Sequence, residues 1–373
     1  MSHWISDPAE LRERLQAAPP RVGLDTEFVR ERTWWPRLAL VQLSLGDGSL
    51  LLADAQVPGI PEALAPTLAD GSVLKVMHSA SEDLVALKRA CGVVPTPLFD
   101  TQLAAGLCGI GAGLGYQRLV QDLLGVALPK GETRSDWMRR PLSPAQLEYA
   151  EDDVVHLFAL HDALEAKLVA LGRLDWLRED CARMVANAAG DELERWPHLS
   201  LRAAQFLDEA GQHRLLRLLR WRDAHAREAD KPRNWILDNE LATALARKPP
   251  ADQAALLRQL QATPKAPRSL AGAVWEALST PLPDESGAPP IRNEERDKGA
   301  LRALQDEVAT LSAELGLPDG VLASRRWLQS LLERRARNEG DWPGPLAGWR
   351  RALLEPRLAP LLRRAGEAPA ASV

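Results

Sequence analysis

The sequence predicts a mixed α/β domain followed by an all-α region, and three observations support this fold class. A strand-like alternation at 21–29 is followed by two apolar runs, 38–45 and 49–54, joined by Gly46-Asp47-Gly48. That arrangement favours a hairpin and an antiparallel start to a sheet. Short apolar strands then alternate with helical patterns, which is typical of a mixed sheet. From about Ser200 onward helical apolar spacing dominates.

Length and composition set broad limits on the kind of protein. A chain of 373 residues, 46% hydrophobic and 26% charged, is expected to form two or three soluble domains. Residues 1–20 lack the apolar centre of a signal peptide, and no apolar run approaches the roughly 18 residues of a membrane helix. The cysteines, Cys91, Cys108 and Cys181, are widely spaced. Neither a disulfide framework nor a zinc site is predicted, and a reducing, cytoplasmic setting fits best.

The net charge of −5 conceals a difference between the two halves of the chain. Residues 1–193 contain 18 Lys and Arg against 27 Asp and Glu, whereas residues 194–373 contain 28 against 24. The halves therefore carry −9 and +4. An acidic front and a basic back suit a metal-dependent site joined to a module that binds a polyanion. The simpler interpretation is an ordinary solvated surface, because +4 over 180 residues is mild.

The first strand carries the most informative pair of residues. Alternation along 21–29 places Asp25 and Glu27 side by side on one face. Two adjacent carboxylates repel each other, and a positive charge between them would offset this repulsion. A divalent cation with oxygen ligands is the natural candidate. The alternative is a solvated acidic face, so the pair needs further acids elsewhere to become a metal site.

A third acid follows the next predicted strand. Residues 73–77 form a short apolar run, after which Ser79 and Glu82 have the spacing of a capping box that opens a helix. Asp83 then falls in the first turn, where free N–H groups and the helix dipole favour a carboxylate. An ordinary helix-start acid is the alternative. The next strand and helix are expected at 98–100 and 101–107.

The fourth acid lies on a long helix predicted from Ser143 to about Leu171. Ser143 is the expected N-cap, followed by a proline at the first helical position. Tyr149 and Asp153 are four residues apart and therefore share one face. Asp152 is three residues from Tyr149, so helical spacing alone leaves it as an alternative to Asp153.

The second half contains two groups of predicted helices. Proline-rich breaks divide it, and 281–290, rich in Pro, Gly and Ser, reads as a linker. Each group includes a Leu-Ala-Gly fragment before a Trp-containing helix, which hints at two related units. Arginine pairs recur near the C-terminus and favour a basic surface: Arg325-Arg326, Arg334-Arg335, Arg350-Arg351 and Arg363-Arg364.

Taken together, these motifs resemble the Tyr subclass of the DEDD exonuclease superfamily and, within it, the bacterial ribonuclease D family. The resemblance lies in the order Asp25-x-Glu27, then the segment ending in Asp83, then Tyr149-x-x-x-Asp153. Further matching segments are Pro36–Leu43, Phe99–Gln102, Gly125–Lys130 and Ser135–Trp137. Residues 215–222 resemble an HRDC nucleic-acid-binding module, and 322–326 with 348–350 resemble a second one.

The resemblance implies a fold and a set of site residues. The first domain is expected to be an RNase H-like α/β exonuclease domain, followed by two all-α HRDC-like domains. The implied boundaries are 1–192, 205–285 and 294–373. The implied catalytic residues are Asp25, Glu27, Asp83, Tyr149 and Asp153, of which the four acids hold two Mg²⁺ or Mn²⁺ ions. The pattern favours Asp153 over Asp152, and Tyr149 is expected to orient the attacking water.

The implied function is a 3′–5′ exoribonuclease that trims RNA 3′ ends, with tRNA precursors as the expected substrates. It would release nucleoside 5′-monophosphates by two-metal hydrolysis. RNA is the expected partner, the protein is expected to be monomeric and cytoplasmic, and no membrane is involved. The alternatives are a 3′–5′ DNA exonuclease with the same site and a catalytically silent RNA-binding scaffold.

Candidate RNA contacts surround the acidic residues in the sequence. Phe28, Trp34 and Trp35 are candidates for stacking on terminal bases. Arg30 and Lys130 are candidates for phosphate contacts. Core packing is an equal alternative for Phe28, and solvated surface is the alternative for the two cations.

Overall fold

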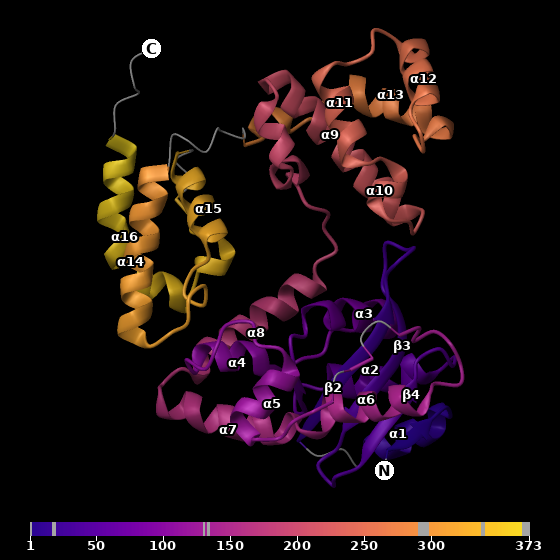
Figure 1. Cartoon of the computed structure of the whole chain (residues 1–373), viewed down its shortest axis with the longest axis vertical. Helices are drawn as coiled ribbons and strands as arrows, with labels where there is room; N and C mark the ends of the chain where they lie inside the picture. Colours follow the sequence, from indigo (N-terminus) through magenta and orange to yellow (C-terminus); the bar gives the residue numbers. More distant parts are fainter. Residues whose placement is uncertain are drawn as a thin grey trace. The chain divides into compact units, whose positions relative to one another are not determined.

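The computed structural model divides the chain into two compact units (Figure 1). One contains Met1–Val29, Leu38–Gly190 and Asp297–Val373, and the other contains Arg30–Arg37 and Asp191–Arg296. The structure describes residues 2–16, 20–129, 131–132, 135–289, 298–336 and 340–367.

The first unit is built on a six-stranded mixed sheet. Its strands are β1 (His3–Ile5), β2 (Arg21–Val29), β3 (Arg37–Ser44), β4 (Leu50–Asp54), β5 (Leu74–Met77) and β6 (Leu98–Asp100). The order across the sheet is β1-β4-β3-β2-β5-β6. The predicted hairpin is confirmed, because β3 and β4 pair antiparallel. The other described pairings, β1 with β4, β2 with β5 and β5 with β6, are parallel.

Helices surround this sheet. They are α1 (Pro8–Gln16), α2 (Ile60–Ala69), α3 (Ser81–Cys91), α4 (Thr101–Leu107), α5 (Tyr116–Leu124), α6 (Pro144–Val155), α7 (Leu157–Ala170) and α8 (Leu174–Ala189). The apolar side chains of β2, Val22 and Leu24, are buried in a core shared with α3 and α7. Helix α6 contacts β2 and β4. A separate apolar cluster that includes Leu40, Leu52 and Ala150 holds α6 in that place.

Two sequence predictions about helix ends are wrong. The helix expected to run from Ser143 to Leu171 is interrupted at His156, whose backbone N–H donates to the Tyr116 hydroxyl (3.3 Å). The capping box expected at Ser79 is absent, since Ala80 is the N-cap of α3 and has no side-chain cap. The Ala80 N–H instead donates to Asp100 (2.8 Å), so β6 anchors the start of α3. The capping box predicted at Ser143 is confirmed.

A C-terminal helical bundle belongs to the same unit. It contains α14 (Lys298–Leu315), α15 (Arg325–Ala336) and α16 (Trp349–Glu367). The Arg350 guanidinium forms a buried ion pair with Asp180 of α8 (2.5 Å), and the Trp349 ring stacks on Trp176 with centroids 4.4 Å apart. The expectation that Arg350 contributes to a basic surface is therefore wrong, because the residue is only 5% exposed. Arg351 pairs instead with Glu355 on the exposed side.

The second unit is helical. It contains α9 (Glu209–Glu228), α10 (Arg233–Ile236), α11 (Asn239–Arg247), α12 (Gln253–Ala262) and α13 (Ala271–Ser279). Short 3₁₀ turns occur in both units at Pro197–Ser200, Arg202–Phe206, Arg268–Leu270, Glu285–Gly287 and Gly344–Leu346. The segment 30–37, which follows β2 in the sequence, packs in this helical unit.

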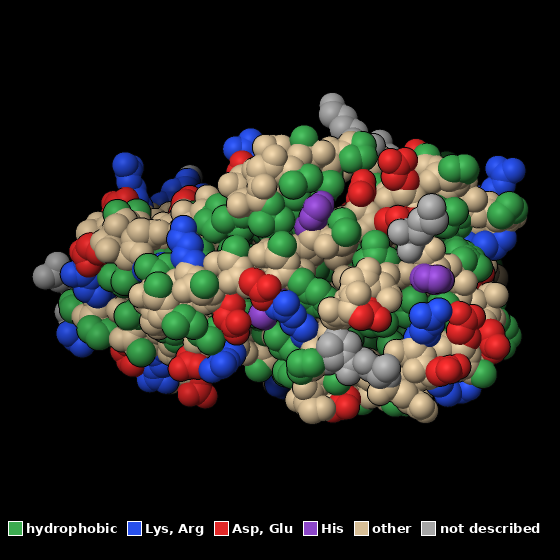
Figure 2. All heavy atoms as spheres, turned by 90° about the horizontal axis from the view of Figure 1, so that it is seen from below, with side chains coloured by type: hydrophobic (Ala, Val, Ile, Leu, Met, Phe, Trp, Pro, Cys, Tyr) green, Lys and Arg blue, Asp and Glu red, His purple; other side chains and the backbone are tan. Residues whose placement is uncertain are grey.

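Charge is distributed evenly on the face drawn in Figure 2. Basic and acidic side chains are interspersed there, and neither sign forms a continuous stripe. Within the described ranges, no helix is long and apolar enough to cross a membrane.

Candidate active site

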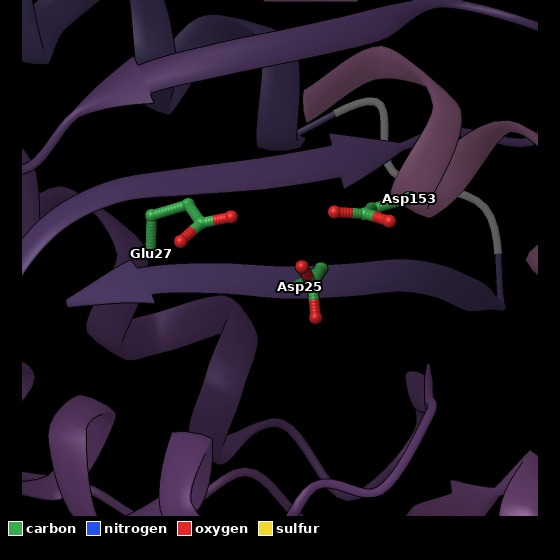
Figure 3. A group of neighbouring side chains, drawn as sticks. All are labelled: Asp25, Glu27 and Asp153. Atoms are coloured by element: carbon green, nitrogen blue, oxygen red, sulfur yellow. The ribbon is translucent and has the colours of Figure 1, made fainter. Parts of the chain in front are cut away.

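Strand β2 positions two of the predicted carboxylates. Val22 and Leu24 are almost fully buried on its apolar side, which fixes the register of the strand. Asp25 and Glu27 are therefore held on the same face, with exposures intermediate between core and surface. Figure 3 shows both carboxylates rising from one strand. The predicted alternation is thus confirmed.

Helix α6 brings the third carboxylate to this strand. Asp153 faces Asp25 and Glu27 from the helix (Figure 3). One carboxylate oxygen from each of these three residues lies within 4.8 Å of the others. The choice of Asp153 over Asp152 agrees with this geometry, because Asp152 is not a member of the cluster. Residues more than 120 positions apart in the chain thus meet at one point.

Asp83 lies beside this cluster but is held by a different contact. Its carboxylate accepts a hydrogen bond from the Thr26 hydroxyl (2.5 Å), and only 9% of the residue is exposed. It is not one of the three acids that share the 4.8 Å group. Its charge nevertheless contributes to the raised pKa of Asp25. The structure therefore brings three of the four predicted ligands together and places the fourth next to them.

Tyr149 lies one helical turn before Asp153. The proximity of its phenol offsets part of the rise in the pKa of Asp153. The centroid of its ring is 5.9 Å from that of Trp137, which is 2% exposed. Burial, followed by the charges of Asp153 and Glu27, raises the pKa of Tyr149. The phenol therefore keeps its proton at neutral pH and serves as a hydrogen-bond donor.

The carboxylates strongly disfavour their own negative charge. Burial and then the neighbouring acids raise the pKa of Asp25 well above its ordinary value, and the same causes raise the pKa of Glu27 to about 9. Burial is also the main cause that raises the pKa of Asp83 to about 6 and that of Asp153 to about 7. Among the described residues, no lysine or arginine forms a salt bridge with any of the four.

This donor set fits hard divalent cations. Carboxylate oxygens are the ligands that Mg²⁺ and Mn²⁺ prefer, and a cation between them would offset the repulsion that raises their pKa values. Cations at such a site can polarise a phosphodiester and a water molecule. The arrangement is therefore suited to metal-assisted hydrolysis.

The predicted RNA contacts lie in different parts of the structure. Phe28 is partly buried against the core of the sheet. Trp34 is 9% exposed and packs against Ala226 and Ile236 of the helical unit. Arg30 is exposed, and its Nε donates to the Trp34 carbonyl (2.9 Å). Lys130 lies outside the described residues.

The Trp34-Trp35 pair has well-defined partners within the helical unit. Both backbone N–H groups donate to one Asp230 oxygen, at 3.1 and 3.0 Å. The guanidinium of Arg233 lies 4.6 Å from the centroid of the Trp34 ring, and that of Arg227 lies 5.1 Å from the Trp35 ring. Their predicted stacking on terminal bases stays a prediction.

Several supporting residues were not identified from the sequence. Asp100, fully buried, accepts hydrogen bonds from the backbone of Ala80 and of the first turn of α4, and so holds the start of α3 that carries Asp83. Tyr116, the second of the two tyrosines, accepts a hydrogen bond at the break after α6. Two patterns in the sequence could have identified these residues. Asp100 directly precedes a predicted helix, and Tyr116 is one of only two tyrosines.

Comparison with known families gives three matches that follow the chain in order. Residues 3–169 match the family described as 3′–5′ exonuclease. Residues 212–266 match the HRDC domain, and residues 297–358 match the C-terminal HRDC domain of ribonuclease D. The predicted fold class, an α/β exonuclease domain followed by two helical HRDC-like domains, is confirmed.

Similar proteins share almost the full length of this chain. Ribonuclease D of Xanthomonas oryzae pv. oryzae is 60% identical over 364 residues, which cover 97% of this chain and 99% of that protein. Ribonuclease D of Pseudomonas paraeruginosa is 35% identical over 93% of this chain and 94% of that protein. The crystal structure of Escherichia coli RNase D, described as an exoribonuclease involved in structured RNA processing, matches with a TM-score of 0.84. Its sequence identity is 30%, over 98% of this chain and 99% of that one.

Proposed function

Because this chain belongs to the ribonuclease D family, and is accordingly a 3′–5′ exoribonuclease, we propose that its three clustered acids, the adjacent Asp83 and Tyr149 form the catalytic site. The observation that carries the proposal is the meeting of Asp25, Glu27 and Asp153 within 4.8 Å. Asp83, beside them, completes the set. Asp25, Glu27, Asp83 and Asp153 would hold two divalent cations, Mg²⁺ or Mn²⁺.

The reaction is the hydrolysis of the last phosphodiester bond of an RNA. Two cations held by these acids would supply charge that polarises the phosphate and stabilises the leaving 3′ oxygen. The Tyr149 phenol, protonated and fixed through Asp153, orients the attacking water by a hydrogen bond. The water oxygen ends on phosphorus, the bond to the 3′ oxygen breaks, and a proton from the water ends on that 3′ oxygen. The product is a nucleoside 5′-monophosphate and an RNA one residue shorter.

The remaining parts of the chain are proposed to guide RNA to this site. The helical domains, predicted at 205–285 and 294–373, would bind the body of the substrate, for which tRNA precursors are the family expectation. Phe28, Trp34 and Trp35 are proposed as base contacts, and Arg30 and Lys130 as phosphate contacts. A monomeric protein acting in the cytoplasm remains our expectation.

The test is a time course on a 5′-labelled single-stranded RNA with Mg²⁺, with Mn²⁺ and with EDTA. We expect a ladder that shortens by one nucleotide at a time and requires the metal. Asp25→Asn and Asp153→Asn should abolish it. Asp152→Asn is a matched control on the same helix turn and should retain activity, because Asp152 lies outside the cluster.

The alternatives give different products in the same assay. Faster shortening of a matched DNA would identify a DNA exonuclease, which differs in how the 2′-hydroxyl is read. RNA that is bound but never shortened would identify a scaffold and would contradict the proposal. Equal loss in Asp152→Asn and Asp153→Asn would contradict the assignment of Asp153.

A further inference from the structure

A glycine between α5 and α6 lies directly against the ring of Tyr149. A Cβ atom built on Gly131 would lie 1.8 Å from Cε2 of that ring and 2.3 Å from Cδ2. Cβ atoms essentially never lie within 3.0 Å of such a neighbouring atom, so no residue with a side chain fits here without movement. The Tyr149 ring therefore leaves room at position 131 for glycine alone.

Two described residues near Gly131, Pro129 and Glu132, accept hydrogen bonds through their carbonyl oxygens. The Pro129 carbonyl accepts a hydrogen bond from the Gln117 side chain of α5 (2.7 Å). The Ser135 N–H donates to the Glu132 carbonyl (2.9 Å). These contacts anchor Pro129 and Glu132. We expect a methyl group added at position 131 to displace the Tyr149 ring rather than the backbone of residue 131.

The Tyr149 ring has a second neighbour on its own side of the sheet. Trp137, which is almost fully buried, contacts it with ring centroids 5.9 Å apart at an angle of 41°. The ring is therefore confined by the Gly131 backbone and by Trp137, and its hydroxyl lies near the Asp153 carboxylate. A small shift of a hydrogen-bonding group costs a large part of its catalytic effect.

We propose that Gly131 is a positioning residue for the exonuclease reaction, because its bare backbone forms the wall that sets the Tyr149 hydroxyl over Asp153. The inference rests on the proposed role of Tyr149 in orienting the attacking water. In this role Gly131 would contact neither metal nor RNA. It acts through the phenol alone, which makes its effect separable from those of the carboxylates.

The experiment measures single-turnover cleavage of a 5′-labelled RNA by Gly131→Ala, Tyr149→Phe and the double variant. We expect Gly131→Ala to slow cleavage by roughly 10- to 100-fold. Tyr149→Phe keeps the ring and removes the hydroxyl, so it should slow cleavage to a similar extent. In the double variant the added methyl should cause little further loss, because the hydroxyl that it displaces is already absent.

Gly71→Ala is the matched control. No atom lies within 4 Å of a Cβ at Gly71, and its φ is not positive, so this variant should cleave RNA like the parent chain. Calorimetric titration with Mn²⁺ is the second readout. Gly131→Ala should bind Mn²⁺ like the parent, since the carboxylates are untouched. Loss of Mn²⁺ binding in Gly131→Ala would show general damage and would overturn the proposal.

Two kinetic outcomes would also overturn it. Unchanged cleavage by Gly131→Ala would mean that the ring accommodates the methyl group at no cost. A loss that is equally large in the Tyr149→Phe background would mean that the methyl acts by another route. Failure of the proposed function has its own result, since Tyr149→Phe would then cleave like the parent chain.

Discussion

Asp25 and Glu27 oppose the stability of the fold that holds them. Each is forced into a setting where burial and neighbouring acids disfavour its charge. A protein retains such a pair of carboxylates when a bound cation supplies the positive charge that the neighbouring residues do not. At the scale of single residues, the site therefore couples metal binding to stability, and this coupling can be measured without any RNA.

The first prediction concerns pH in the presence of EDTA. The folded chain raises the pKa of Glu27 from 4.5 to about 9. Between these values the folded state keeps a proton that the unfolded state loses, so rising pH favours unfolding. We expect Glu27→Gln to flatten the fall in melting temperature between about pH 5 and pH 8. A parallel curve for the variant would contradict the raised pKa.

The second prediction concerns metal binding. Mn²⁺ or Mg²⁺ should raise the melting temperature at about pH 8, and a ligand at 100 times its dissociation constant stabilises by about 2.7 kcal/mol. Asp25→Asn and Asp153→Asn should lose most of this shift. Asp152→Asn should keep it, since it lies outside the cluster. A scanning fluorimetry titration measures all four proteins, and equal shifts in all of them would argue against the site.

At the scale of helices and strands, the sequence predicted the features that depend on residues close to each other in the chain. The alternation of 21–29 and the capping box at Ser143 depend on residues near each other in the chain, and both are confirmed. The break at His156 could not be predicted, because the group that stabilises it is the hydroxyl of Tyr116, 40 residues away. The start of α3 depends in the same way on Asp100, 20 residues from Ala80.

The third prediction tests the element that carries Tyr149 and Asp153. The Ser143 hydroxyl accepts from the Gln146 N–H (3.2 Å) at the start of α6. Ser143→Ala should lower the free energy of unfolding by about 1 kcal/mol. Ser143→Asp keeps an acceptor at the cap and should retain most of the stability. Urea unfolding compares the three proteins, and equal stabilities would show that the cap contributes nothing.

At the scale of the whole molecule, distant segments complete each unit. The C-terminal bundle is joined to α8 by the buried pair of Asp180 and Arg350, 170 residues apart. The sequence favoured a solvated arginine pair at 350–351, because nothing near Arg350 in the chain reveals its partner. The site was predictable to a greater extent, since a known order of motifs links its distant acids, whereas the contacts of Thr26 and Gly131 required the structure.

The fourth prediction compares two adjacent arginines. Arg350→Ala leaves Asp180 buried with one partner fewer and should cost about 3–5 kcal/mol. Arg351→Ala removes only an exposed pair with Glu355 and should cost less than about 1 kcal/mol. Urea unfolding followed by tryptophan fluorescence reports both, because Trp176 and Trp349 stack beside the buried pair. Similar costs for the two variants would contradict this assignment.

The segment 30–37 has a consequence for the order in which the chain assembles during synthesis. Trp34 follows β2, the strand that carries Asp25 and Glu27, yet the aspartate that binds its N–H lies 196 residues later. At a translation rate of about 5–20 residues per second, Trp34 is added to the chain about 10–40 s before Asp230. For that interval an apolar pair of tryptophans lacks its final partners. The exonuclease sheet can begin to form first, and the helical unit closes around this early segment only when α9 is complete.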